Sequence, residues 1–359
     1  MANGNEVLQR RNQFNISLSF TPYAYNGSQN VYSFGAKEGP HVSALNTRTG
    51  EFKCLVVRTD ATNGKRFSDA EDRLAVSMFT TIFLDKDLNL VSKELKLFGK
   101  DNAFIGCTIN EEGEIFVSTQ SGDQIVVEEF SPKGDPVAKL MTSFSLKKKG
   151  NYVPVMVADQ QNKKGILLGM YYENSDKSSY NAYYTFDFTV KKVFTATEEK
   201  LNKEFARSLG AVKDHRGPAG RLSSIDGLQI VDILQAGDKN IVIREMRSVG
   251  VEARIMDYFH EFLVISFYDR SWWPLGNAAY DKMLQTSAGL GRSLGYWMEN
   301  GKLYLAANAL SSVIGDCTTL LFTVDIDTMK IEKSSVIDKS GLPSKAYMEG
   351  GSTIHFGNT

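Results

Sequence analysis

The sequence has few of the residues that bind metals, form disulfides or interrupt strands. Its 359 residues include three cysteines, four histidines and eight prolines. Cys54, Cys107 and Cys317 lie far apart without C-x-x-C spacing, and the histidines are too dispersed for a metal cluster. No metal or cofactor site is therefore expected. Each cysteine lies in or beside an apolar run and is predicted to be a small buried hydrophobe, although one disulfide is arithmetically possible.

The chain also lacks an excess of charge of either sign. It has 41 basic and 42 acidic residues, which argues against broad binding to nucleic acid or anionic membrane, while a local patch stays open. With 42% hydrophobic residues it can build an extensive core.

Several signatures of known reaction chemistries are missing as well. There is no P-loop, and Gly289 to Gly295 has the wrong spacing for a dinucleotide loop. His260-Glu261 lacks the second histidine of a zincin helix. No catalytic residue is assigned, and a protein without enzymatic activity is favoured.

The N-terminal segment 1–13 is polar, has no apolar core of a signal peptide, and is expected to be flexible. No transmembrane span is expected anywhere in the chain. Taken literally, the sequence indicates a cytoplasmic protein; the alternative is an exported protein whose signal has been removed.

What the sequence does contain is a loosely repeated unit of apolar runs separated by polar turns. It is readable at Phe104 to Met141, Val153 to Thr197 and Leu320 to Val336. Four strand-length runs in about 40 to 50 residues are typical of a β-propeller blade. We therefore expect an all-β fold, a β-propeller with four-stranded antiparallel blades.

Five blades can be placed along the chain. They are Lys37 to Phe98, Ala103 to Phe144, Tyr152 to Thr197, Leu228 to Leu284 and Leu294 to Ile337. A sixth would combine Ser352 to Phe356 with Phe14 to Phe20 and Val31 to Phe34, because pairing the two ends of the chain removes exposed strand edges. We expect six blades in a single domain over 14–359, with seven as the alternative.

Aspartates follow the third strand of most of these units, as at Asp187, Asp269 and Asp325. Their carboxylates are expected to accept backbone hydrogen bonds in tight turns. The D-x-D pairs among them lack the other ligands of a calcium loop.

One insertion, at about 197–226, breaks the repeat. Leu201, Phe205 and Leu209 are spaced for a short amphipathic helix over Thr197 to Leu209, with Thr197 as its N-cap. A basic loop rich in Gly and Pro follows. In it, His215 stands between two charged residues and is a candidate binding residue or general base.

Trp272 and Trp273 form the sharpest candidate for a contact surface. Two adjacent indole rings in a strand-exit loop suit sugar stacking, a peptide groove or a protein hot spot. The alternative is that one ring plugs the blade and the other packs beneath the loop.

Further candidates lie at strand ends. Tyr172 belongs to a tyrosine-rich pair of strands that would line a groove, although aromatic residues are also ordinary strand formers. Glu173, Glu245 and Asn308 end or follow second strands and are expected near a rim or a central channel. Converging carboxylates there would suit acid-base chemistry or cation binding, whereas polar strand ends are commonly just solvated.

Several C-terminal segments resemble a family. The segments Ile230 to Glu245, Glu261 to Asp269, Lys282 to Gln285 and Lys302 to Asn308 are similar to uncharacterised exported β-propeller proteins of Bacteroidetes. The chain departs from that pattern at Met283-Leu284 and at Ala309. The resemblance implies an exported propeller, periplasmic or on the cell surface, and transfers no catalytic residue.

These observations favour a non-enzymatic β-propeller that recognises a protein or glycan partner through rim loops. Two alternatives stay open. One is a carbohydrate-active hydrolase or lyase with carboxylates at the channel mouth, and the other is a structural subunit of a cell-envelope complex.

The buried-cysteine hypothesis predicts that Cys54, Cys107 and Cys317 react with a thiol reagent only after the protein unfolds. Mass spectrometry of the native and the urea-unfolded protein after brief labelling measures this directly. Rapid modification of any of the three in the native protein would contradict it.

Overall fold

A computed structural model of the chain describes sixteen segments. These are residues 20–25, 29–34, 41–45, 52–60, 75–84, 89–97, 103–110, 112–121, 123–144, 151–173, 178–195, 198–209, 227–252, 255–286, 294–310 and 317–336. Side chains are described mainly from Ile105 onward, with gaps. The N-terminal segment 1–13 and the loop that carries His215 lie outside these residues.

The chain forms two compact units, whose main parts are residues 30–198 and residues 199–359. The expectation of one domain over 14–359 stays a prediction.

The first unit consists of antiparallel meanders. A two-stranded sheet of β1 (Phe20–Tyr25) and β2 (Gln29–Phe34) comes first along the chain. The next eight strands are β3 (His41–Leu45), β4 (Phe52–Asp60), β5 (Ala75–Leu84), β6 (Leu90–Leu97), β7 (Ala103–Ile109), β8 (Ile115–Ser121), β9 (Gln124–Phe130) and β10 (Pro136–Ser143). They form two four-stranded meanders, joined where Ala75 of β5 pairs with Ala103 of β7. The last meander contains β11 (Asn151–Ala158), β12 (Gly165–Glu173), β13 (Ser179–Asp187) and β14 (Lys192–Thr195).

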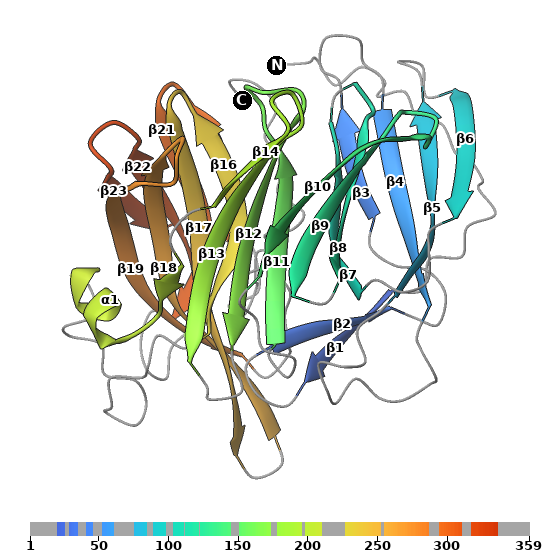
Figure 1. Ribbon diagram of the computed structural model, residues 1–359. Coiled ribbons are helices and arrows are strands. Elements are labelled where there is room, and N and C mark those ends of the chain that lie inside the picture. Colours follow the sequence, from blue (N-terminus) through green and yellow to red (C-terminus); the bar gives the residue numbers. More distant parts are fainter. Residues whose placement is uncertain are drawn as a thin grey trace. The chain divides into compact units, whose positions relative to one another are not determined.

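The second unit begins with the short strand β15 (Glu199–Lys200) and helix α1 (Lys203–Ser208). Two four-stranded antiparallel sheets follow (Figure 1). The first contains β16 (Leu228–Ala236), β17 (Lys239–Glu252), β18 (Ile255–Asp269) and β19 (Pro274–Thr286); the second contains β20 (Leu294–Glu299), β21 (Lys302–Leu310), β22 (Cys317–Asp325) and β23 (Lys330–Val336).

Several middle strands are covered on both faces where their side chains are described. In β12 every residue from Gly165 to Tyr172 is buried, without the alternation of a strand that has one wet face. The outer strand β10 alternates between exposed and half-buried residues instead. A near-continuous apolar run therefore marks β12 as a middle strand.

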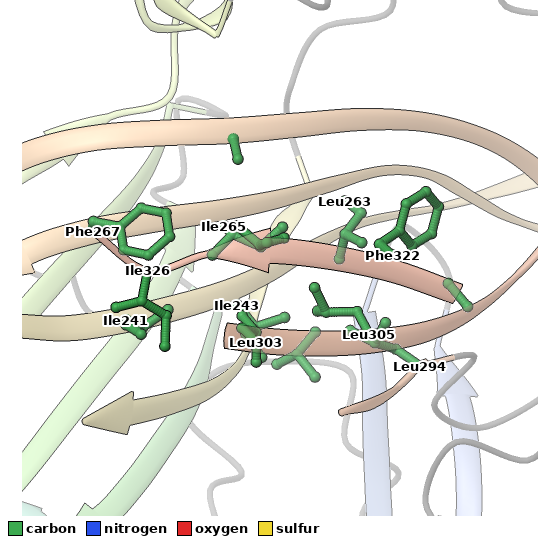
Figure 2. Packing of buried hydrophobic residues seen from close by; sticks show 14 residues of the cluster. Ile241, Ile243, Leu263, Ile265, Phe267, Leu294, Leu303, Leu305, Phe322 and Ile326 are labelled. Atoms are coloured by element: carbon green, nitrogen blue, oxygen red, sulfur yellow. The ribbon is translucent and has the colours of Figure 1, made fainter. Parts of the chain in front are cut away.

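Within each unit, neighbouring sheets pack face to face through an apolar layer. In the first unit Ile105, Phe116 and Val127 belong to one cluster with Ile166 and Phe186 of the next sheet. In the second unit the corresponding layer joins residues of β16 to β19 with residues of β20 to β22. Figure 2 shows residues of β17 and β18 in this layer together with residues of β20 to β22. Each fully buried Leu, Ile or Phe stabilises such a layer by roughly 1.5 to 3 kcal/mol.

The chain is thus an all-β protein with a β-propeller fold of four-stranded antiparallel blades. Five meanders coincide with the five blades that the sequence predicts. The sixth blade stays a prediction, since Ser352 to Phe356 and most of Phe14 to Phe20 lie outside the described residues.

The predicted aspartate turns between third and fourth strands are confirmed at three places. The Oδ1 atom of Asp187 accepts hydrogen bonds from the N–H groups of Thr189 (2.9 Å) and Val190 (3.1 Å). Asp325 Oδ1 accepts one from the N–H group of Thr328 (2.6 Å), which lowers the pKa of the Asp325 carboxyl. The third place is Asp269, whose Oδ1 accepts hydrogen bonds from the N–H groups of Ser271 and Trp273. Among the described side chains, no group of His, Cys, Asp and Glu is arranged to hold a metal ion.

The predicted helix is shorter than expected, and its predicted N-cap is wrong. Residues 199–200 are extended, and Asn202 caps α1 by accepting hydrogen bonds from Glu204 N (2.9 Å) and Phe205 N (3.0 Å). The helix starts late because Glu199 and Lys200 form strand β15 instead. Leu201 and Leu209 are buried, as the apolar spacing predicts.

The side chain of Cys107 is buried and takes part in no disulfide. This agrees with the predicted role of a small hydrophobe. The side chains of Cys54 and Cys317 lie outside the described part of the chain.

The face-to-face layer of the second unit predicts a large cost for Leu305→Ala. Leu305 is fully buried, so truncation leaves a cavity and lowers the free energy of unfolding by about 2 to 5 kcal/mol. Urea unfolding measures this, with Leu275→Ala as the control, because Leu275 is 41% exposed and its truncation should cost no more than about 0.5 kcal/mol. Equal midpoints for the two variants would contradict the packing.

Candidate functional site

The turn between β18 and β19 is held by one aspartate. Asp269 Oδ1 accepts hydrogen bonds from the backbone N–H groups of Ser271 and Trp273, both at 2.8 Å. The backbone N–H of Asp269 donates to Trp273 O (2.9 Å), and that of Trp272 donates to Asp269 O (3.0 Å). Four hydrogen bonds within five residues leave the backbone of this turn little freedom.

Trp272 points into the protein. Its side chain is only 3% exposed, and its ring meets the ring of Tyr268 edge-on at a centroid distance of 5.8 Å. The backbone at Trp272 has a φ of 64°, in the left-handed region where a bulky residue costs about 1 to 2 kcal/mol. Burial of the indole offsets that cost, so Trp272 fixes the turn and is not accessible to a partner.

Trp273 points outward. It is 70% exposed, more than the other exposed large hydrophobic residues among the described side chains. Pro274 and Leu275 follow it and are also exposed. Of the two tryptophans proposed as contact residues, only Trp273 therefore offers its ring to a partner, and the alternative that one ring is a plug holds for Trp272.

A charged cluster lies behind the turn. Arg244 is fully buried, and its Nη2 donates to Glu199 Oε2 at 2.9 Å and also contacts the hydroxyl of Tyr268. The Tyr268 hydroxyl donates to Glu199 Oε1 at 2.7 Å. The guanidinium carbon lies 5.3 Å from the centre of the Phe205 ring, which is within cation–π range. This cluster fixes Tyr268, against which Trp272 packs.

Two further turns lie beside the β18–β19 turn. Lys239 begins β17 and is the register partner of Asp269, which places the 237–238 turn next to it. Lys239 Nζ is 3.6 Å from Asp238 Oδ1 and 3.6 Å from Asp327 Oδ1, so it links this turn to the 326–329 turn of β22 and β23. Met329 Sδ comes close to Gly276 of β19. We call the exposed residues Asp238, Trp273, Pro274, Leu275 and Asp327 the three-turn surface.

Tyr172 is a core residue. Its ring stacks on Tyr180 at 5.1 Å and meets Phe144 edge-on at 5.5 Å. Burial raises the pKa of the Tyr172 hydroxyl, and a hydrogen bond to Glu198 raises it further. Burial likewise raises the pKa of Tyr184. Tyr172 is fully buried, so the hypothesis that it lines an open groove is wrong for this structure.

The remaining candidates do not form one described site. Glu173 is half-buried at the end of β12 in the first unit, and Glu245 is fully buried in β17 of the second unit. The backbone of Asn308 lies in β21, but its side chain is outside the described residues, as is all of His215. Burial rules out Glu245 as an exposed binding residue, and the predicted convergence at a channel stays a prediction.

Sequence reasoning missed the carboxylates of the three-turn surface and the Arg244 cluster. Asp238 and Asp327 look like ordinary turn residues, and nothing in the sequence shows that Lys239 links them. A signal for the cluster does exist. Arg244 interrupts the apolar run Ile241 to Ile243, and a charge in a fully buried strand requires a partner.

No protein-family model matches the chain, and no curated protein is recognisably related to it in sequence. Solved structures resemble it in fold only. They include the β-propeller domain of the Trilobed protease from Pyrococcus furiosus (10% identity, 85% of this chain and 83% of that chain, TM-score 0.30). They also include the SapL1 lectin in complex with α-methyl fucoside (9% identity, 83% and 78%, TM-score 0.37). An α-L-arabinofuranosidase from Fusarium graminearum in complex with an iminosugar inhibitor is similar at 10% identity (83% and 80%, TM-score 0.42). Similarity this low carries no argument about function.

Among the described residues, no helix is long and apolar enough to cross a membrane.

The cluster behind the turn predicts that Glu199→Gln destabilises the second unit. The substitution keeps the shape of the side chain but removes the charge next to the buried Arg244, which should lower the free energy of unfolding by about 1 to 3 kcal/mol. Glu204→Gln is the matched control, because Glu204 is exposed in the first turn of α1 and should change stability by less than about 0.5 kcal/mol. Urea unfolding followed by tryptophan fluorescence compares them, and equal stabilities would contradict a structural role for Glu199.

Proposed function

We propose that this β-propeller is a non-enzymatic binding protein that recognises a protein or glycan partner through the three-turn surface, with Trp273 as the anchor. The observation that carries the proposal is the difference in exposure between two residues that are adjacent in the chain. Trp272 is 3% exposed and Trp273 is 70% exposed, on a turn fixed by four hydrogen bonds.

The geometry of this turn favours binding. A ring presented on an ordered backbone loses little conformational freedom when a partner covers it, so more of the contact energy appears as affinity. Tryptophan is also among the residues that most often dominate interface energies. The adjacent Pro274 and Leu275 extend the apolar contact beyond the ring.

The carbohydrate-active alternative needs two carboxylates that face one substrate. In the second unit, Glu245 is fully buried and the Asp269 carboxylate accepts two backbone hydrogen bonds. Neither suits a general acid or a nucleophile. We therefore infer binding rather than hydrolysis.

The resemblance to exported propellers of Bacteroidetes supports a partner in the cell envelope. In a structural subunit of an envelope complex, the same turn would serve as the anchor.

The proposal predicts that Trp273→Ala weakens partner binding at least tenfold, which is about 1.4 kcal/mol, and leaves the unfolding midpoint nearly unchanged. Immobilised wild-type protein and variants are exposed to native extract and to a glycan array, and retained proteins are quantified by mass spectrometry. Dissociation constants are then measured with the recovered partner.

Two control variants make the result specific. Phe194→Ala removes another exposed aromatic, on β14 of the first unit, and should keep the partner. Trp272→Ala should lower the unfolding midpoint by several degrees because it empties a buried site. A partner retained equally by wild type and Trp273→Ala shows that the binding surface lies elsewhere.

A further inference from the structure

The three-turn surface combines an exposed aromatic side chain with exposed carboxylates. Asp238 and Asp327 have side chains that are 88% and 90% exposed, on the two turns beside Trp273. Lys239, which contacts both carboxylates at 3.6 Å, is only 18% exposed. The lysine therefore holds the two turns together from within, while the carboxylates remain at the surface.

The other aspartates of these turns differ from Asp238 and Asp327. The carboxylates of Asp269 and Asp325 accept hydrogen bonds from backbone N–H groups of their own turns. They are part of the turn structure, whereas Asp238 and Asp327 extend into solvent. Of the charged side chains on these three turns, the carboxylates of Asp238 and Asp327 are thus the most exposed to a partner, while Lys239 lies 3.6 Å from each of them.

We propose that the three-turn surface binds a cationic segment of a protein partner in which Lys or Arg stands next to an apolar side chain. This inference rests on the proposed function and names the chemistry of its partner. The cation lies over the exposed face of the Trp273 indole and pairs with Asp238 or Asp327, an arrangement that satisfies both cation–π attraction and charge pairing. The neighbouring apolar side chain covers Pro274 and Leu275.

The apolar neighbours of the ring favour a peptide over a glycan. A sugar that stacks on an indole also needs hydrogen-bond donors and acceptors placed around the ring for its hydroxyl groups. Here the residues that continue the chain from Trp273 are Pro274 and Leu275, and the Asp269 carboxylate is already used within the turn. An anionic glycan would in addition be repelled by Asp238 and Asp327.

The charged contacts should make a modest, salt-dependent contribution. Exposed ion pairs contribute little each, so replacing both carboxylates should weaken binding about threefold to tenfold at low salt. Because ionic screening shortens the range of these charges, the difference should shrink at high salt. The Trp273 ring, in contrast, should matter at every salt concentration.

A random peptide library displayed on phage tests the proposal without knowledge of the partner. The library is selected on the wild-type protein after depletion on Trp273→Ala, so that only binders that depend on the ring remain. We expect enriched peptides that place Lys or Arg beside Trp, Phe, Leu or Ile. The strongest peptide is then labelled and titrated by fluorescence anisotropy against wild type and an Asp238→Asn, Asp327→Asn double variant.

The matched control for charge is Asp123→Asn, an exposed aspartate of the first unit. It should bind the peptide like wild type, and thermal unfolding confirms that all variants are folded. The double variant should bind about threefold to tenfold more weakly at low salt.

The outcomes separate this inference from the proposed function. Ring-dependent peptides that are acidic or carry no charge would overturn the cationic partner and leave the Trp273 surface as a binding site. A ring-dependent glycan on an array, with no peptide enriched, would likewise overturn it and retain the binding function. If no peptide or glycan depends on Trp273, both the inference and the proposed function fail.

Discussion

The structure depends on one constraint, which is that middle strands such as β8, β12, β17 and β18 are buried on both faces over most of their described length. A strand such as β12, buried from Gly165 to Tyr172, is stable only between two neighbouring layers. Within each unit the sheets accordingly pack face to face through the two apolar clusters. Because the faces are used for packing, the positions left for recognition are the turns and the outer strands.

The turns between third and fourth strands show how the repeat supplies such positions. In three of them, the β13–β14, β18–β19 and β22–β23 turns, an aspartate accepts backbone hydrogen bonds and one residue has a positive φ, namely Lys191, Trp272 or Met329. Each also directs one apolar side chain inward: Phe188, Trp272 and Ile326 are all at most 5% exposed. Because the aspartate fixes the backbone and the inward apolar side chain fills the space beneath the turn, the residue that points outward is free to vary from one turn to another. It is Val190 in the first unit and Trp273 in the second, where the large ring gives the turn a binding surface.

The sequence predicts the parts of the structure that depend on local pattern. The five meanders and the aspartate turns follow from apolar runs and turn residues that are neighbours in the chain. The N-cap of α1 is predicted five residues too early, because nothing local in the sequence shows that Glu199 and Lys200 form strand β15, or that the Glu199 carboxylate contacts Arg244 and Tyr268, which are far away in sequence. The sequence likewise does not show which of Trp272 and Trp273 is buried. The two residues are identical and lie in one turn, and Trp272 is the one whose ring packs against Tyr268.

The Arg244 cluster connects the inserted segment to the candidate site. Glu199 and Phe205 come from the segment that breaks the blade repeat, and both contact Arg244. Glu199 also fixes the hydroxyl of Tyr268, the ring against which Trp272 packs. Trp272 in turn sets the direction of Trp273, because adjacent residues of this turn lie on opposite sides of the backbone. The insertion thus stabilises the surface from behind, and its conformation and the presentation of the Trp273 ring are coupled through a chain of direct contacts.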